Sequence, residues 1–423
     1  MRTLRVLHVI GGGDTGGAMS HLLPLLSALE VAGADIRLLC LGEGGLADEA
    51  RRRGLTVGVL PMDNPRDTSV LRPLRRLLAT GPAEMEATIA GGAQTGRSAL
   101  VRGARWDVVH THGMRANLPV RLAMRGLRPR PCVFTTVHSD LYLDYASPTL
   151  ARAYQTIDRV TVGFVDKVIC VSDDLRSLLV RRGYPAGRLL TIYSGLEGLA
   201  QQAGRRRGVG VPPGDPGDTG DVGRDEPRAG GTRAPRIGTA ARLVPVKDVG
   251  LLLEAAGFLR RETLDLEVVI VGDGPERARL EADAAALGFG GAARFAGQIS
   301  DVRSILEQLD VYVVTSVYEG GVSMSVLEAM AQGLPVVAAA GGGVSEAVEN
   351  NVTGFVVSRD QEREDLAAAL AERIGVLLRD PELRARMGAA GAQRVQERFT
   401  IERVAKATLR AYERCLAAHG EVF

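Results

Sequence analysis

Short β-rich runs alternate with helical patterns along nearly the whole chain, and this alternation most constrains the fold. Strands separated by helices favour parallel pairing, and parallel sheets are covered on both faces. The first half predicts strands at 5–10, 35–41, 56–60, 107–112, 133–138, 167–172 and 189–193. The pattern restarts with 235–241, 266–272, 293–297, 311–316, 334–340 and 354–358. We therefore expect an α/β protein with two doubly wound, Rossmann-like domains that face each other across a cleft.

A segment rich in glycine and proline marks the boundary between these domains. In 201–235, 14 of 35 residues are Gly or Pro and none is aromatic, which is typical of a flexible linker. We expect a first domain over 1–200, with a surface insertion at 80–103, and a second domain over 236–398. The remaining residues, 399–423, form an amphipathic helix with Ile401, Val404, Ala405, Leu409 and Tyr412 on one face.

Charge and hydropathy exclude several classes of protein. The net charge of +2 over 423 residues gives no reason to expect a nucleic-acid partner. No run approaches the roughly 20 apolar residues of a membrane span, and the N-terminal apolar run is too short for a signal peptide. We expect a cytoplasmic protein with four buried, reduced cysteines: Cys40, Cys132, Cys170 and Cys415. The basic stretch 71–79 either rests on anionic lipid at the inner membrane face or is solvated.

Four charged residues follow two of the predicted strands in the second half. Arg242 and Lys247 come after 235–241, where an arginine fork and a lysine point charge can hold two phosphates. Glu319 and Glu328 come after 311–316, and a carboxylate near a helix start suits vicinal hydroxyls. Taken singly, each has a simpler explanation as a solvated loop charge or as compensation of the helix dipole. Together they predict a nucleotide-sugar site.

A glycine-rich turn follows the first strand. The sequence GGGDTGGAMSH at 11–21 places backbone N–H groups and a helix start at the carboxyl edge of the sheet, where an anion is stabilised. Gly11-x-Gly13-x-x-Gly16, with Glu43 beyond the second strand, also fits a dinucleotide fingerprint and leaves an NAD-dependent oxidoreductase as an alternative.

Three histidines lie at the ends of two neighbouring strands. His110 and His112 end one strand and His138 ends the next, so all three are expected to face the cleft. The HxH spacing also raises a metal site, but no spaced carboxylate or cysteine completes one. We expect no metal and assign to His138 a polar contact with a reacting sugar.

Ten ordered blocks resemble glycosyltransferase family 4, whose members have the two-domain GT-B architecture. They are RVLHVIGGGDTGGAMSH, VVHTHGMRA, TTVHSD, VICVSDDLR, IYSG, ARLVPVKD, VGDGPERARLE, FAGQISDVRSIL, SVYEGGVSMSVLEAMAQGLPVVA and GGGVSEAV. The resemblance implies a hexosyltransferase in which the second domain binds an NDP-sugar, the first binds the acceptor, and the terminal helix crosses back to the first domain. It further implies retention at the anomeric carbon, no essential metal and no cofactor, since the NDP-sugar is a substrate.

The resemblance also assigns roles. Arg242 and Lys247 grip the diphosphate, Glu328 holds the ribose, Glu319 orients the donor sugar, and His138 contacts the sugar near its reacting carbon. The implied catalytic residues are His138, Arg242, Lys247 and Glu319, and the implied donor-binding residues are Gly16, Gly17, Arg242, Lys247, Gly272, Ile299, Glu319, Gly320, Gly321, Val322 and Glu328.

Donor, acceptor and turnover are left open by the residues. The donor is a UDP- or GDP-sugar, and the acceptor is a glycan, a lipid-linked sugar or a small molecule, as in polysaccharide or glycolipid biosynthesis. Eight residues separate Glu319 from Glu328, one more than the family usually has. This departure supports an alternative, a subunit that binds sugar nucleotides without turnover.

Overall fold

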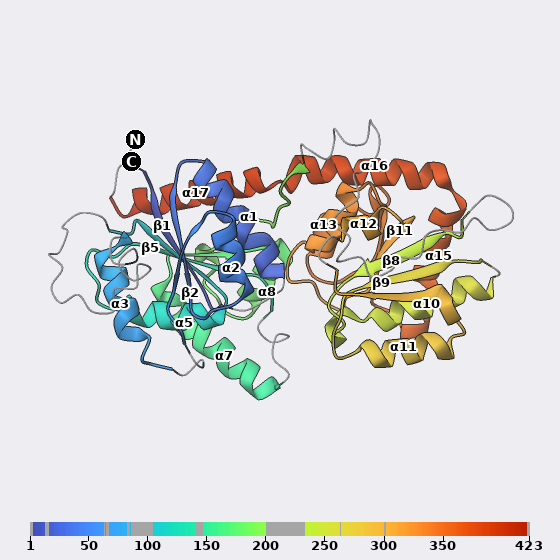
Figure 1. Ribbon diagram of the computed structural model, residues 1–423, viewed down its shortest axis with the longest axis horizontal. Helices are drawn as coiled ribbons and strands as arrows, with labels where there is room; N and C mark the ends of the chain where they lie inside the picture. The colour runs from blue at the N-terminus through green and yellow to red at the C-terminus, as the bar shows by residue number, and fades with distance from the viewer. Residues whose placement is uncertain are drawn as a thin grey trace. The chain divides into compact units, whose positions relative to one another are not determined.

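Two compact units make up the chain in the computed structural model, which describes residues 3–12, 17–62, 64, 67–82, 85, 105–140, 147–199, 233–262, 264–299 and 302–420. Unit 1 comprises Met1–Gly195 and Ile401–Phe423, and unit 2 comprises Leu196–Thr400 (Figure 1). The predicted linker lies outside the described residues except for 233–235. The predicted insertion lies outside them except for 80–82 and 85.

The sheet of unit 1 has seven parallel strands in the order β3-β2-β1-β4-β5-β6-β7. The strands are β1 Arg5–Ile10, β2 Asp35–Cys40, β3 Thr56–Val59, β4 Val108–His112, β5 Cys132–Val137, β6 Lys167–Cys170 and β7 Leu189–Thr191. Every strand predicted in the first half is therefore present. The strand order reverses between β1 and β4, as a doubly wound sheet requires.

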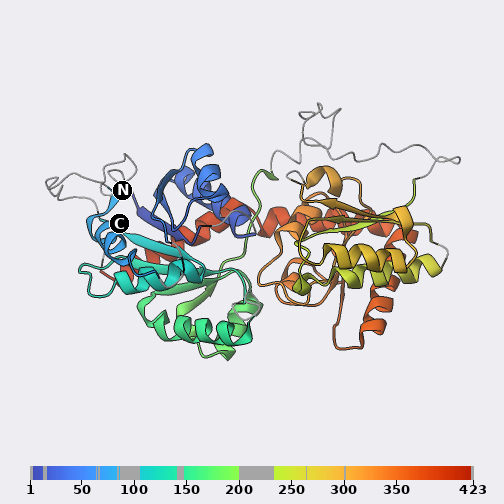
Figure 2. The ribbon, with the colours of Figure 1, turned by 60° about the horizontal axis from the view of Figure 1, so that its bottom comes forward.

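Helices cover both faces of this sheet (Figure 2). They are α1 Gly17–Val31, α2 Gly45–Arg52, α3 Leu71–Thr80, α5 Met114–Ala123, α7 Pro148–Thr161, α8 Asp173–Arg181 and α17 Ile401–Ala418. The terminal helix α17 lies beside α1 (Figure 1) and buries Ile401, Val404, Ala405 and Tyr412 in the core of unit 1. The predicted return of the terminal helix to the first domain is confirmed.

Unit 2 has six parallel strands in the order β10-β9-β8-β11-β12-β13. The strands are β8 Arg236–Ala240, β9 Glu267–Val271, β10 Ala293–Gly297, β11 Val311–Val314, β12 Val336–Ala339 and β13 Gly354–Val357. The helices are α10 Val249–Arg261, α11 Arg277–Ala286, α12 Arg303–Leu306, α13 Met324–Ala331, α14 Val344–Ala347, α15 Arg363–Arg379 and α16 Pro381–Arg398. Here the strand order reverses between β8 and β11, and ligands of such sheets bind beyond the carboxyl ends of the strands at this point.

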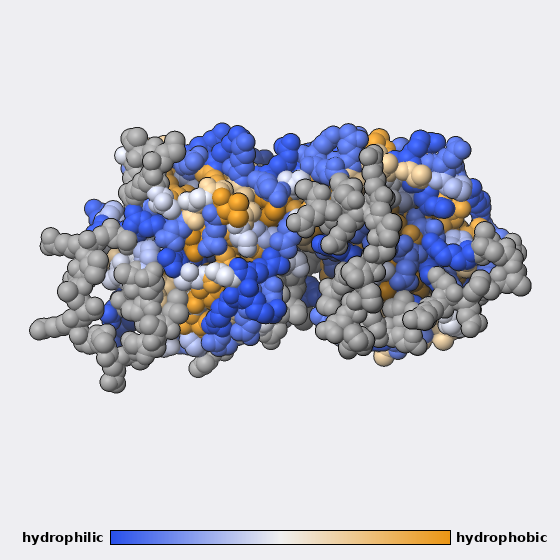
Figure 3. All heavy atoms as spheres, turned by 45° about the horizontal axis from the view of Figure 1, so that its top comes forward, coloured by the Kyte–Doolittle hydropathy of each residue, from blue (hydrophilic) through white to orange (hydrophobic). Residues whose placement is uncertain are grey.

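The basic stretch 71–79 forms most of helix α3. Its side chains Leu74, Leu77 and Leu78 are at most 5% exposed and pack in the core of unit 1, so they are not free to enter a bilayer. Hydrophilic side chains alternate with smaller hydrophobic areas on the face drawn in Figure 3. Among the described residues, no helix combines the length and the apolar content needed to cross a membrane.

Candidate functional site

A short ion pair joins the two loops that leave β8 and β11. Lys247 ends the 3₁₀ turn Pro245–Lys247, and its Nζ lies 2.6 Å from Oε1 of Glu319. The same Oε1 accepts a hydrogen bond of 2.6 Å from Ser316 Oγ. The side chains of Lys247 and Glu319 are only 18% and 11% exposed. Two predicted site residues are therefore in contact at the point where the strand order reverses.

Backbone contacts hold these two loops together. The hydroxyl of Thr315 donates to the carbonyl of Lys247 at 3.1 Å, and the N–H of Val317 donates to the carbonyl of Val246 at 2.8 Å. Asp248, which follows Lys247, has a left-handed φ of 46° and is the N-cap residue of helix α10. These contacts fix the backbone at Lys247, and Glu319 fixes its ammonium group.

A third loop, which follows β12 and is rich in glycine, positions the backbone of Glu319. The N–H of Gly343 donates to the carbonyl of Glu319 at 2.8 Å, and the N–H of Glu319 donates to the carbonyl of Gly341 at 3.3 Å. Gly342 has a φ of +62°, and a Cβ there would lie 2.0 Å from the Glu319 carbonyl oxygen. The sequence block GGGVSEAV contains this contact, but sequence reasoning gave it no role.

Arg242 and Glu328 lie on either side of this pair in the sequence and differ in exposure. Arg242 follows β8 on the surface, and within the described part of the chain its guanidinium has no ion pair. Glu328 is the fifth residue of α13 and is half-buried. Burial raises the pKa of Tyr312 to about 12, and the Glu328 carboxylate contributes to this shift.

Two glycines in VGDGPERARLE press against the loop that carries Arg242. A Cβ at Gly272 would lie 1.9 Å from the carbonyl oxygen of Ala241, and one at Gly274 would lie 2.4 Å from that of Leu243. Gly272 has a φ of +125° and donates to the carbonyl of Gly297 at 2.7 Å. Glycine is required here for close packing of three loops at the strand ends. This explains Gly272 without a ligand.

The remaining predicted donor residues occupy separate places. In unit 2, Ile299 follows β10 and is half-buried, Gly320 and Gly321 are half-buried, and Val322 is 3% exposed. In unit 1, Gly17 is the first residue of α1. The predicted contact at Gly16 lies outside the described residues.

The histidines of unit 1 do not all lie at its surface. His110 and His112 are 0% and 2% exposed, so the expectation that all three histidines face a cleft is wrong for these two. They lie within β4 and not beyond its end, because the strand runs as far as His112. His138 follows β5 and is half-buried.

Burial keeps these imidazoles neutral. Desolvation lowers the pKa of His8 and of His21 to about 3 and that of His138 to about 4. It also lowers the pKa values of His110 and His112 well below 6.5, and the neighbouring histidines add to the shift. At neutral pH each ring therefore carries one N–H donor and one acceptor nitrogen.

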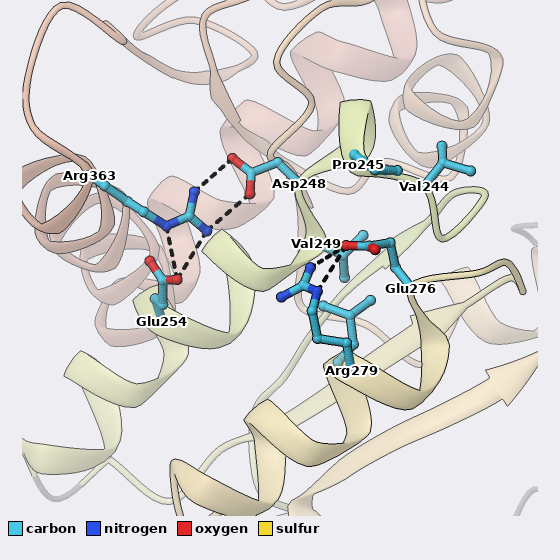
Figure 4. A pocket seen from close by; sticks show the side chains of 9 residues that line it. Val244, Pro245, Asp248, Val249, Glu254, Glu276, Arg279 and Arg363 are labelled. Atoms are coloured by element: carbon cyan, nitrogen blue, oxygen red, sulfur yellow. Dashed lines mark hydrogen bonds and ion pairs between the residues drawn. The ribbon is translucent and has the colours of Figure 1, made fainter. Parts of the chain in front are cut away.

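A cavity of about 350 Å³ lies beside the Lys247 loop (Figure 4). Its lining includes Arg363, which lies 3.0 Å from both Asp248 and Glu254, and Arg279, which lies 2.5 Å from Glu276. Both guanidinium groups already face carboxylates, so the cavity offers a poor site for phosphate. The predicted diphosphate contacts, Arg242 and Lys247, are not among the residues that line this cavity.

Two family models match the chain, one in each unit. The model for glycosyl transferases group 1 matches residues 227–394, and that for a glycosyl transferase 4-like domain matches residues 16–195. Alpha-maltose-1-phosphate synthase of Mycolicibacterium smegmatis is 28% identical over 329 residues, which are 73% of this chain and 79% of the relative. Glycogen synthase of Mycobacterium tuberculosis is 26% identical over 406 residues, which are 94% and 91% of the two chains.

Solved structures share the fold over nearly the whole length. The HepE protein of Anabaena, solved in complex with UDP and glucose, is 18% identical with a TM-score of 0.71, over 96% of this chain and 99% of that one. Sucrose-phosphate synthase from Thermosynechococcus elongatus is 21% identical with a TM-score of 0.67, over 98% and 100%.

Proposed function

The chain belongs to glycosyltransferase family 4, has the GT-B fold and uses a sugar-nucleotide donor, and on this premise we propose that it is a retaining, metal-independent hexosyltransferase. The donor that we propose is a UDP- or GDP-sugar. The relatives include a protein solved with UDP and glucose, which supports UDP as the first nucleotide to test. The acceptor is a glycan, a lipid-linked sugar or a small molecule.

The observation that carries this proposal is the Lys247–Glu319 pair at the end of β8 and β11. An ammonium has three N–H donors, and the contact with Glu319 uses one of them, so others remain for phosphate oxygens. Oε1 of Glu319 accepts both recorded hydrogen bonds, from Lys247 and Ser316, while Oε2 accepts none from the described residues. Glu319 can therefore keep Lys247 in place and still accept a hydroxyl of the donor sugar.

Catalysis in this proposal is mainly electrostatic. Negative charge builds on the departing diphosphate, and positive charge builds on an oxocarbenium-like sugar. Lys247, held by Glu319 before the donor arrives, stabilises the negative charge with little reorganisation, and Arg242 supplies a second cation from the neighbouring loop position. Glu328 accepts the ribose hydroxyls from α13, and His138 contributes a neutral hydrogen bond to the transferred sugar. Amides at the start of α1, near Gly16 and Gly17, approach a phosphate.

A panel of NDP-sugars, scored for released UDP and GDP with and without acceptors, tests the proposal. Arg242→Ala should lower kcat/KM by an amount that corresponds to a loss of about 2–4 kcal/mol in transition-state stabilisation, by analogy with the loss of an oxyanion donor. Arg279→Ala is the matched control, because this exposed arginine of unit 2 is paired, among the described residues, with the carboxylates of Glu276 and Asp283 on its own helix surface. The proposal fails if no donor is bound or turned over and Arg242→Ala changes nothing.

The same assays separate the alternatives. Tight nucleotide binding with no transfer to any acceptor would favour a subunit without turnover, and binding of NADH would favour an oxidoreductase. Flotation with anionic liposomes at low and high salt tests membrane contact. Because the leucines of α3 are buried, such contact would depend on its arginines and should be lost at high salt.

A further inference from the structure

A continuous row of hydrogen-bonding side chains crosses the core of unit 1, and we call it the histidine chain. Its members come from β1, β4, β5 and α17 and end at the residue that follows β5. In order they are Thr136, His110, Tyr412, His8, His112 and His138. The successive donor–acceptor distances are 2.7, 2.6, 3.5, 3.0 and 3.3 Å. Both ring nitrogens of His110, His8 and His112 are used.

The rings of His8, His112 and His138 lie end to end. The ring centroids of His8 and His112 are 5.3 Å apart and the facing nitrogens 3.0 Å apart, a difference of 2.3 Å. For His112 and His138 the values are 5.6 and 3.3 Å, again a difference of 2.3 Å. This difference is the width of one imidazole ring, so each pair of nitrogens points along the line that joins the centroids. Such an arrangement is that of N–H···N hydrogen bonds.

The same geometry argues against a metal in this cluster. Nitrogens of His8, His110 and His112 all lie within 4.8 Å of one another, as metal ligands would. Ligands of one ion must converge on a common point about 2.0–2.1 Å from each nitrogen. The facing nitrogens of His8 and His112 instead aim at each other across 3.0 Å, which leaves room for a proton.

Because the rings are neutral, all hydrogen bonds along the histidine chain must donate in the same direction. A neutral imidazole donates at one nitrogen and accepts at the other, and the hydroxyl of Tyr412 has one proton to give. If His110 donates to Tyr412, then Tyr412 donates to His8, and each later ring passes the direction on. Only two fully bonded arrangements exist, and they place the proton of His138 on different nitrogens.

Thr136 selects one of these two arrangements. Its side chain is buried at 3% exposure, and within the described residues its hydroxyl contacts only His110 Nε2. If Thr136 accepts from His110, its own O–H is buried without an acceptor, at a cost of about 1–3 kcal/mol. If Thr136 donates, every member down to His112 is satisfied, and His138 Nε2 receives the last hydrogen bond.

We propose that the histidine chain holds His138 in the tautomer with its proton on Nδ1, and that Tyr412 is a positioning residue for the transfer reaction. Nδ1–H of His138 is then not used within the histidine chain and can donate to an oxygen of the transferred sugar. This consequence for catalysis rests on the proposed function, whereas the tautomer of His138 does not. The helix α17 thereby takes part in the site through one hydroxyl group.

Long-range ¹H–¹⁵N NMR spectra of the full-length protein, labelled with ¹⁵N in its histidine rings, test the proposal. His138 is assigned by the signal lost in His138→Gln. In the unaltered protein Nδ1 of His138 should be protonated and Nε2 should not. Tyr412→Phe and Thr136→Val each remove the preference for one direction, so His138 should become a mixture of tautomers. The value of kcat should then fall about twofold to tenfold, following the fraction of competent tautomer, with KM little changed.

Tyr184→Phe is the matched control, because it also removes a buried hydroxyl from unit 1. That hydroxyl donates to Asp158 Oδ2 at 2.7 Å, outside the histidine chain. It should leave the spectrum of His138 unchanged. A protonated Nε2 on His138 in the unaltered protein, or an unchanged tautomer in both chain variants, would overturn the proposal. A changed tautomer with unchanged kcat would support control of the His138 tautomer by the histidine chain. It would overturn the second part of the proposal, that this tautomer matters for the transfer reaction.

Discussion

The two candidate sites solve the problem of buried polarity in opposite ways. All six histidines of the chain lie in unit 1 and none lies in unit 2. The histidine chain is buried and neutral, whereas Lys247 and Glu319 of unit 2 form a largely buried ion pair. Buried polar groups must be hydrogen-bonded, and buried charges must be paired or neutralised. The stability of the histidine chain should therefore depend on pH, and that of the Lys247–Glu319 pair should depend on the presence of both partners.

Acid should destabilise unit 1 more than unit 2, and this is the largest effect that we expect. The pKa values of His8 and His21 fall from 6.5 to about 3 on folding, so the unfolded chain binds more protons than the folded chain between these limits. The free energy of unfolding of unit 1 therefore falls as pH drops below 6.5, by about 4 kcal/mol at pH 5 for these two groups together.

Trp106, the single tryptophan, is buried in unit 1 and reports this transition by fluorescence. Hydrogen exchange of peptides from unit 2 provides the comparison, because that unit has no histidine to titrate. Loss of protection in both units at the same pH would contradict the assignment of acid sensitivity to the histidines.

Removal of one charge from the pair should destabilise unit 2 by less. Glu319→Gln leaves the partly buried Lys247 ammonium without its carboxylate, at a cost of about 1–3 kcal/mol. The double variant Lys247→Met, Glu319→Gln should cost less than the sum of the single changes. Urea unfolding followed by exchange in unit 2 measures these values, and strictly additive costs would show that the pair is not coupled.

Gly342→Ala tests whether Glu319 is positioned by its neighbouring loop. The new Cβ would lie 2.0 Å from the Glu319 carbonyl oxygen at a φ of +62°, so the loop must move or the residue must bear about 1–2 kcal/mol of strain. Gly257→Ala, in the interior of α10 where a Cβ would lie at an ordinary contact distance of 3.7 Å from Leu287 Cδ2, should instead stabilise unit 2 by about 0.5–1 kcal/mol. Equal signs for the two variants would contradict this explanation.

Loss of a surface ion pair should have the smallest effect. Arg279 is 54% exposed, and its contacts with Glu276 and Asp283 lie on the surface of α11. Arg279→Ala should change the free energy of unfolding of unit 2 by at most about 0.5 kcal/mol, and less at high salt. Thermal unfolding at two salt concentrations measures it. A cost as large as that of Glu319→Gln would show that the Lys247–Glu319 pair contributes no more to stability than an exposed ion pair.

Sequence patterns predicted the strands and the edges of the sheets, but not the contacts between distant side chains. Each predicted strand is present, because β-rich runs between glycine-rich turns are a local signal. The contact of Lys247 with Glu319 was not predicted, although both were placed at strand ends. It depends on loop conformations that are fixed by Gly342 and by the hydrogen bond from the Thr315 hydroxyl to the carbonyl of Lys247.

The histidine chain was harder still to predict. Helical spacing indicated that Tyr412 would be buried, but its partner His110 is 302 positions away in the sequence. The two meet because α17 packs on the face of unit 1 toward which His110 points. That choice of face is a tertiary property, and no pattern within the helix specifies it.

Unit 1 is interrupted in sequence by the whole of unit 2. A ribosome must therefore synthesise unit 2 in full before it delivers α17. Until then the nascent unit 1 lacks one of the helices that cover one face of its sheet, and His110 lacks the hydroxyl of Tyr412. Unit 2, continuous from Leu196 to Thr400, can fold first although its gene segment begins later. The order of folding is then expected to be the reverse of the order of synthesis.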